Sequence, residues 1–264
     1  MVIIMSKKIV AIGGGENGRI LENGEKSLYE TEAMDIEIIR LTEKEKPNYL
    51  FINHAMSFSK EVQDSYYETM KKIYGDKFGC DCKHLSSSDL YNEELVNELI
   101  KWADIIYEGG GDTLSMIQLW KETGFDKKLY EAWEEGKVIC GISAGAVCWF
   151  KYCNSDCDNS KFEKVDCLNW FDAFITPHCD EKGRMESTKS QLKDTNSVGL
   201  LMSNCSAIEI VDDKYRIITS SGNDRNFSKG YIYKAYWNDN EYFETKLSES
   251  EDFLPLKGLI EKND

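Results

Sequence analysis

Val138-Ile-Cys-Gly-Ile-Ser-Ala-Gly-Ala-Val-Cys-Trp-Phe150 is the most informative segment of this 264-residue chain. It starts with apolar residues that are typical of a buried strand, and a helix-compatible run begins at Ala144. Between them, Gly141-Ile-Ser143-Ala-Gly145 has the spacing of a sharp strand-to-helix turn. Such a turn needs glycine on either side because two stretches of backbone come very close. It also lifts the oxygen of Ser143 above the sheet, at the positive end of the new helix.

The chain before and after this segment alternates short β-type runs with longer amphipathic runs. This alternation predicts a mostly parallel sheet that is flanked by helices on both faces. Strands are expected at Lys8–Ile12, Tyr49–Asn53, Asp104–Tyr107 and Val138–Gly141. Helices are expected at Ser59–Tyr74, Thr113–Thr123 and Asp126–Gly136, and from Ala144 onward.

The last third of the chain changes character. Short β-type runs with polar turns between them occur at Ala207–Val211, Tyr215–Thr219 and Gly230–Tyr236, which predicts a meander at the edge of the same domain. No Gly/Ser-rich or Pro-rich tract interrupts the chain. We therefore expect an α/β fold in one domain over residues 1–264, ending in a C-terminal β meander.

The composition excludes several classes of partner. With 32 Lys and Arg against 47 Asp and Glu, the formal net charge is −15, so the surface repels phosphate backbones and nucleic acid is not an expected partner. The longest largely apolar stretch, at 138–150, is too short to cross a membrane. The first residues do not resemble a secretory signal, and we expect a cytoplasmic protein.

The cysteines do not form a recognisable metal or disulfide pattern. There are nine, an odd number, and none is part of a Cys-x-x-Cys pair. Cys80-x-Cys82-x-His84 lacks a second pair of ligands at a suitable spacing. We expect reduced thiols, no metal and no cofactor.

A second motif, Gly109-Gly-Gly111-Asp112-Thr113, lies between an expected strand and an expected helix. Three successive glycines let the backbone approach a ligand and present amides to it. An oxyanion hole needs two such donors, one of them conventionally from the residue after the nucleophile, so Gly111 and Ala144 are the candidates. Gly110 and Asp112 become candidate substrate contacts. A phosphate-binding loop is disfavoured because no G-x-G-x-x-G and no P-loop lysine is present.

The sequence has only three histidines, and His178 is the one that follows Ser143. It ends the run Phe174-Ile-Thr-Pro-His178, in which Pro177 stiffens the backbone. His178 is therefore the candidate general base. A carboxylate is needed to orient it, and the first choice is Asp156, with Asp158 and Glu163 as alternatives.

These motifs together resemble the peptidase E (aspartyl dipeptidase) family of serine peptidases, which is related to cyanophycinases. The resemblance rests on the elbow Gly-x-Ser-Ala-Gly-Ala, a triple-glycine strand end some thirty residues earlier and a Pro-His about thirty-five residues later. It covers roughly Lys8 to Glu209 and implies a class I glutamine amidotransferase-like fold with serine in the place of cysteine. It also implies a catalytic triad of Ser143, Asp156 and His178, a small peptide substrate, and a monomer or homodimer.

One departure from the family pattern affects the expected specificity. In enzymes of this family that remove N-terminal aspartate, asparagine typically follows the three glycines, and an arginine downstream of the histidine binds the substrate carboxylate. Here Asp112 fills the first position and would repel an acidic side chain. Arg184 is the nearest downstream arginine and the candidate for the second role. A peptide amine, or a basic or neutral side chain, suits Asp112 better.

Three alternative functions remain open. An α/β-hydrolase-type esterase shares the G-x-S-x-G motif, although it usually has its histidine much further downstream. A glutamine amidotransferase needs a cysteine where this chain has Ser143. A small-molecule binding protein with a decayed triad would bind a ligand without turning it over.

Overall fold

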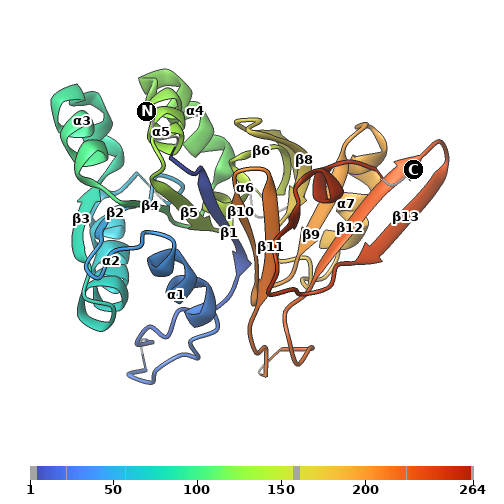
Figure 1. The fold of residues 1–264 in the computed structure, drawn as a ribbon, viewed down its shortest axis with the longest axis horizontal. Coiled ribbons are helices and arrows are strands. Elements are labelled where there is room, and N and C mark those ends of the chain that lie inside the picture. The colour runs from blue at the N-terminus through green and yellow to red at the C-terminus, as the bar shows by residue number, and fades with distance from the viewer. Residues whose placement is uncertain (1–4, 22, 57, 157–160, 224, 263–264) are drawn as a thin grey trace.

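Two β-sheets lie side by side, and Figure 1 shows the smaller one beyond β10 and β11, away from β3. The computed structural model describes residues 5–21, 23–56, 58–156, 161–223 and 225–262. Within these ranges the larger sheet has eight strands in the order β14-β11-β10-β1-β5-β4-β2-β3. The smaller sheet has six, in the order β13-β12-β9-β8-β6-β7.

The bounds of the elements are as follows. The larger sheet contains β1 Lys8–Gly14, β2 Asn48–Ile52, β3 Asp81–Leu85, β4 Ile105–Glu108, β5 Val138–Ile142, β10 Ser206–Val211, β11 Lys214–Thr219 and β14 Leu254–Pro255. The smaller sheet contains β6 Phe150–Ser155, β7 Glu163–Asp166, β8 Phe171–Thr176, β9 Val198–Met202, β12 Ile232–Asn238 and β13 Glu241–Lys246. The helices are α1 Glu32–Arg40, α2 Lys60–Lys71, α3 Glu93–Trp102, α4 Thr113–Thr123, α5 Phe125–Glu134, α6 Ala144–Val147, α7 Arg184–Lys193 and α8 Lys257–Ile260, with the π-helix η1 Lys72–Lys77 and the 3₁₀-helix η2 Ser87–Tyr91.

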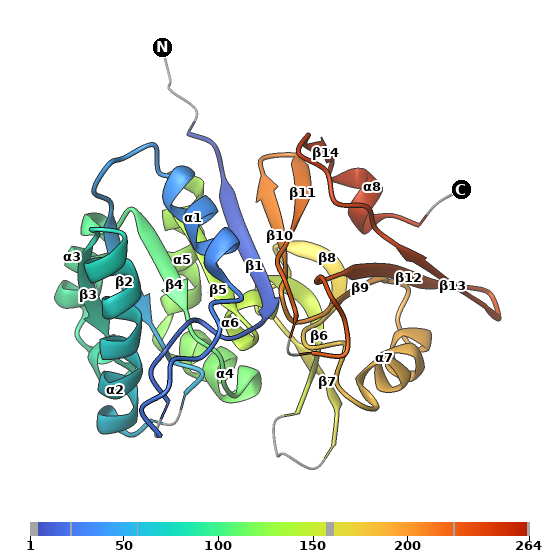
Figure 2. The ribbon, with the colours of Figure 1, turned by 90° about the horizontal axis from the view of Figure 1, so that it is seen from below.

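Helices cover both faces of the larger sheet, as the alternation of the sequence predicts (Figure 2). Successive side chains of a strand point to opposite faces. In β1, Ile9 and Ala11 therefore join the core under α3, α4 and α5, while Val10 and Ile12 join the core under α1 and α2. The α/β fold with a parallel sheet core between helices is confirmed. No helix in the described ranges is long and apolar enough to cross a membrane.

The parallel strands of the larger sheet bring three sequence motifs to one edge. β5 pairs in parallel with both β1 and β4, so the carboxyl ends of the three strands lie together. Residues 13–15 span the end of β1, residues 109–111 directly follow β4, and Ser143 directly follows β5. In open α/β sheets, ligands bind at this edge.

The expected C-terminal meander is divided between the two sheets. β10 and β11 form an antiparallel pair beside β1 in the larger sheet. The run Gly230–Tyr236 instead enters the smaller sheet as most of β12, between β9 and β13. Local alternation predicts that a segment is a strand, but the partner of that strand depends on contacts far away in the sequence. The smaller sheet therefore could not be recognised from the pattern.

Candidate active site

Ser143 lies at the tip of a strained turn between β5 and α6. Its backbone angles are φ 55° and ψ −114°, which are unfavourable for a residue with a side chain. A Cβ atom on Gly141 would lie 2.5 Å from the carbonyl oxygen of Glu108, and one on Gly145 would lie 2.2 Å from the same oxygen. The two flanking glycines are thus required by the close approach of β4. The helix that follows is short, because the chain enters β6 at Phe150.

His178 meets Ser143 from the connection between β8 and α7. Its Nε2 lies 2.9 Å from the hydroxyl oxygen of Ser143, which is a hydrogen-bond distance. The backbone amide of His178 donates to the carbonyl of Gly13, and the Cε1 and Nδ1 side of the imidazole lies next to Gly14. A Cβ atom on Gly14 would lie 2.3 Å from Nδ1 of His178. The absence of a side chain at Gly14 is what admits the imidazole.

Asn204 and Asp180 hold the other side of the imidazole. Oδ1 of Asn204 accepts a hydrogen bond from Nδ1 of His178 over 2.8 Å. The amide nitrogen of Asn204 donates to both carboxylate oxygens of Asp180, over 3.1 and 2.9 Å, and its backbone amide donates to Asp180 over 2.7 Å.

This arrangement fixes which nitrogen of His178 carries the proton. A carboxylate only accepts hydrogen bonds, so Asp180 keeps the amide nitrogen of Asn204 turned toward itself and Oδ1 toward His178. Nδ1 then carries the proton, and the lone pair of Nε2 faces the hydroxyl of Ser143. Burial lowers the pKa of His178 below its usual 6.5, while the hydrogen bond to Asn204 acts in the opposite direction. The imidazole is therefore neutral and able to accept a proton at neutral pH.

The expectation that Asp156 orients His178 is wrong in its geometry. The carboxylate of Asp156 lies 3.1 Å from the guanidinium of Arg184, and Asn204 occupies the position beside Nδ1. Glu163 is an exposed residue of β7 and pairs with Ser155 across the strand. Asp158 lies outside the described residues. Asp156 is close in sequence to Ser143, but the partner of His178 comes from the connection between β9 and β10.

The glycine motif after β4 lies directly beside the nucleophile. A Cβ atom on Gly110 would lie 3.3 Å from Cβ of Ser143 and 3.9 Å from its hydroxyl oxygen. In the elbow, the amide of Ser143 donates to Ile12 and that of Gly145 donates to Gly109. The roles of Gly111 and Ala144 as oxyanion donors remain predictions, and both residues lie at this edge.

The loop that carries the three glycines rests on a buried carboxyl group. Glu108 is fully buried, and its Oε1 accepts from the amide of Ala55 over 3.1 Å. The carbonyl of Ala55 in turn accepts from the amide of Asp112 over 2.7 Å. Burial raises the pKa of Glu108 well above its usual value. Through Ala55, Glu108 supports the loop that carries the three glycines.

The two expected specificity residues each have partners within the fold. Asp112 is the N-cap of α4, where its oxygens accept from the backbone amide and the hydroxyl of Ser115 over 3.0 and 3.1 Å. Arg184 is buried, with its side chain 3% exposed, and pairs with Glu181 and Asp156. Helix capping and ion pairing thus already use these charges, and the roles of both residues as substrate contacts remain predictions.

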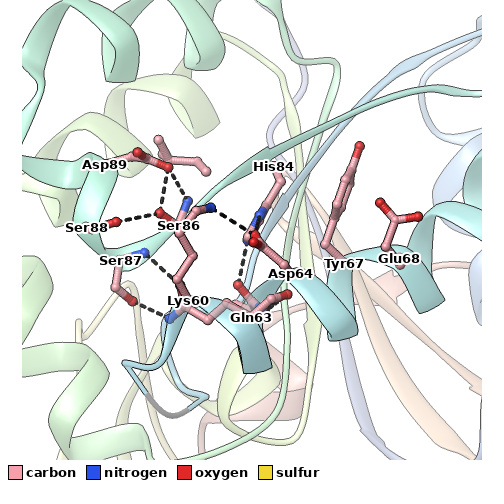
Figure 3. Close-up of polar contacts among 12 residues, drawn as sticks. Lys60, Gln63, Asp64, Tyr67, Glu68, His84, Ser86, Ser87, Ser88 and Asp89 are labelled. Atoms are coloured by element: carbon pink, nitrogen blue, oxygen red, sulfur yellow. Dashed lines mark hydrogen bonds and ion pairs between the residues drawn. The ribbon is translucent and has the colours of Figure 1, made fainter.

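The other two histidines have structural roles. His54 is buried, its Nε2 lies 2.9 Å from the carbonyl of Leu85, and its Nδ1 accepts from the indole of Trp120. Burial lowers the pKa of His54 to about 3, so it stays neutral. His84 is a residue of β3, stacked on Tyr67 of α2 and 3.5 Å from Asp64 (Figure 3). His178 is thus the histidine that reaches the nucleophile.

A cleft of about 600 Å³ opens beside the glycine motif. One wall is a face of α2, and the other is the segment after β1. The described residues that line it are Gly15, Glu16, Asn17, Arg19, Met56, Glu61, Val62, Ser65, Tyr66, Thr69, Gly110, Gly111 and Ile142. Burial raises the pKa of Tyr66 to about 12, so its hydroxyl remains a neutral hydrogen-bonding group. Among the described residues, no group of three or more His, Cys, Asp or Glu is placed to hold a metal ion.

The comparisons with known proteins identify the family. A model of peptidase family S51 matches residues 20–218. The chain belongs to peptidase family S51. It is 34% identical over 179 residues to the uncharacterized peptidase YgaJ of Bacillus subtilis, covering 67% of this chain and 71% of that one. It is 33% identical over 145 residues to the uncharacterized peptidase Lin0382 of Listeria innocua, covering 51% of this chain and 68% of that one.

A solved structure shares the fold. The crystal structure of a peptidase from an acI-B1 Actinobacterium superposes with a TM-score of 0.71 at 18% identity, over 96% of this chain and 98% of that chain. The resemblance of the sequence to the peptidase E family is therefore confirmed at the level of family and fold.

Sequence reasoning missed the two residues behind His178. Asp180 could have been considered, since it lies two positions after the candidate base. Asn204 carries no motif, and only the packing of the two sheets brings it to the site. Gly14 lies just after the expected strand Lys8–Ile12, but its contact with the imidazole depends on the same packing.

Proposed function

We propose that this family S51 protein is a serine-type peptidase that cleaves small peptides through an acyl-enzyme. The observation that carries the proposal is the 2.9 Å contact between the hydroxyl of Ser143 and Nε2 of His178. A hydroxyl on a strained elbow beside a neutral imidazole is the arrangement of an activated serine nucleophile.

The reaction follows from the orientation of the groups. The oxygen of Ser143 attacks the carbonyl carbon of the scissile peptide bond, and Nε2 of His178 takes its proton. The amides of Gly111 and Ala144 stabilise the oxyanion of the tetrahedral intermediate. The imidazolium then gives its proton to the leaving amine. Water, activated by His178, hydrolyses the ester and regenerates the hydroxyl of Ser143.

Asn204 and Asp180 act in this mechanism as positioning residues. Asn204 holds His178 in the tautomer that can accept a proton from Ser143. The side chain of Asn204 is neutral, but the carboxylate of Asp180 lies directly behind it. This carboxylate favours the imidazolium of His178 that forms during attack. The carboxylate thus acts on the imidazole through the intervening amide.

The experiment is labelling with a fluorophosphonate probe, followed by mass mapping of the adduct and assay with a dipeptide panel. We expect an adduct on Ser143 that is absent in Ser143→Ala and in His178→Ala, with both variants folded. Either variant should hydrolyse peptides at least about a thousandfold more slowly than the wild type. Ligand binding by a wild-type protein that neither reacts with the probe nor cleaves any peptide would favour the binding-protein alternative instead.

A further inference from the structure

The position of the cleft beside Gly110 indicates which part of the substrate it binds. It is lined by the glycine motif and by Ile142, the residue before Ser143. His178, Asn204 and Asp180 are not among the described residues that line it. In the proposed reaction His178 protonates the leaving amine, so that amine must lie on the imidazole side. The cleft, which these residues do not line, is where the acyl part of the substrate fits.

The walls of the cleft are largely uncharged. Met56, Val62 and Ile142 supply apolar surface, Tyr66 adds an aromatic ring, and Ser65 and Thr69 add hydroxyl groups. A volume of about 600 Å³ lies within the range of small-molecule sites. The cleft can therefore hold an amino-acid side chain together with its α-amino group.

Not all the charged residues that line the cleft form ion pairs. Arg19 lies 3.3 Å from Glu16, so these two charges largely offset one another. Glu61 accepts a hydrogen bond from the hydroxyl of Ser59 over 2.7 Å. Lys60, its neighbour on α2, pairs instead with Asp64 over 3.0 Å. Among the described lining residues, Glu61 is thus the charged group that makes no ion pair, although Lys60 lies near enough to act on it.

We propose that this cleft binds the acyl residue of the substrate and selects for a positively charged group on it. The preferred ligand is a short peptide whose N-terminal residue is basic, followed by one that is neutral, with acidic residues disfavoured. The carboxylate of Glu61 attracts the cationic side chain, and the apolar wall receives its methylene groups. The position of the cleft on the acyl side rests on the proposed function, whereas its preference for a cation rests on Glu61 and the Glu16–Arg19 pair.

The test measures binding separately from turnover. The dipeptides Lys-Ala, Leu-Ala and Asp-Ala are titrated into the Ser143→Ala protein by calorimetry, and their hydrolysis by the wild type is followed in parallel. We expect Lys-Ala to bind at least about tenfold more tightly than Asp-Ala, with Leu-Ala between them. Glu61→Gln should reduce this ratio about fivefold through weaker binding of Lys-Ala. Glu68→Gln is the matched control, because Glu68 is an exposed residue of the same helix outside the cleft.

The outcomes separate the two proposals. Selective binding that depends on Glu61, without turnover by the wild type, supports the cleft and contradicts the peptidase mechanism. Turnover with equal affinity for the three dipeptides, or an unchanged ratio in Glu61→Gln, overturns the cleft and leaves the mechanism standing. Preferred binding of Asp-Ala that is lost in Arg19→Gln would assign the opposite charge preference to the cleft and would also overturn the proposal.

Discussion

The two halves of the candidate site are built in different ways. The nucleophile half consists of the carboxyl ends of β1, β4 and β5, where glycines let the backbone of one strand approach another. The base half consists of side chains from two connections, the one between β8 and α7 and the one between β9 and β10. Backbone holds Ser143 in place, whereas a chain of hydrogen bonds through Asn204 to Asp180 holds His178.

This difference predicts which kinds of substitution disrupt each half of the site. The nucleophile half tolerates no added atoms, because its contacts are at van der Waals distance. The base half tolerates changes of size better than changes of hydrogen-bonding groups, because its geometry depends on donors and acceptors. Substitutions on either side should therefore fail for different reasons and by different amounts.

The largest effect is expected from Gly14→Ala, where the two halves touch. The new Cβ atom would lie 2.3 Å from Nδ1 of His178 and 2.2 Å from Oδ1 of Asn204, so the imidazole must move away from Ser143. The second-order rate constant of fluorophosphonate labelling should fall about a thousandfold or more. Gly24→Ala is the control, since Gly24 also has a positive φ of 83° but no atom within 4 Å of the added Cβ. Near-normal labelling of Gly14→Ala would contradict the packing of His178.

A smaller effect is expected from Asp180→Ala. Without the carboxylate, the amide of Asn204 can rotate and present its nitrogen to His178, which favours the wrong tautomer. Labelling should slow about tenfold to a hundredfold. Asp172→Ala removes an exposed carboxylate of β8 that pairs with Lys151 and should leave the rate unchanged. Equal rates for the two variants would show that Asp180 does not position the base.

The pH dependence of the labelling rate tests the environment of His178, and the expected effect is smaller. The rate of labelling should fall as the pH is lowered through the pKa of His178, because the protonated imidazole cannot accept the proton of Ser143. Since burial lowers that pKa, the midpoint should lie below 6.5. Asn204→Asp puts a carboxylate beside Nδ1 and should raise the midpoint by about one pH unit. His84→Gln should not move it, and a wild-type midpoint above 6.5 would contradict the burial of the base.

The smallest effect on activity is expected at Asp112. Because Asp112 caps α4, Asp112→Ala should lower the free energy of unfolding by about 1 kcal/mol while the labelling rate stays within about threefold of wild type. Denaturant titration and labelling together measure both quantities. Asp112→Asn can still accept the capping hydrogen bond and should retain the stability. A large loss of peptide cleavage with unchanged stability would show that Asp112 is a substrate contact.

The nucleophile half could be predicted from the sequence, and the base half only in part. Short-range physics dictates the elbow, since glycines at 141 and 145 around Ser143 and an apolar strand before them are visible in one line of sequence. The helix expected at Thr113–Thr123 coincides with α4, whose ends are capped by Asp112 and Gly124. These features depend on neighbours a few residues away.

The remaining parts depend on how the two sheets meet. Asn204 lies in the connection between β9 and β10, which passes from the smaller sheet to the larger one. Neither the existence of that second sheet nor the route of this connection follows from local periodicity. Asp156 is closer to His178 in sequence than Asn204 is, but its carboxylate pairs with Arg184. Asp112 and Arg184 likewise have partners inside the fold.

The most direct measurement compares the labelling rates of Asn204→Ala and Asp156→Ala with that of the wild type. If Asn204 orients the base, Asn204→Ala should react with fluorophosphonate at least about a hundredfold more slowly, because Nδ1 of His178 loses its acceptor. Asp156→Ala should react within about threefold of the wild-type rate, because its carboxylate bonds to Arg184. The reverse order, with Asp156→Ala slow and Asn204→Ala unaffected, would contradict the proposed chain from Ser143 through His178 to Asn204.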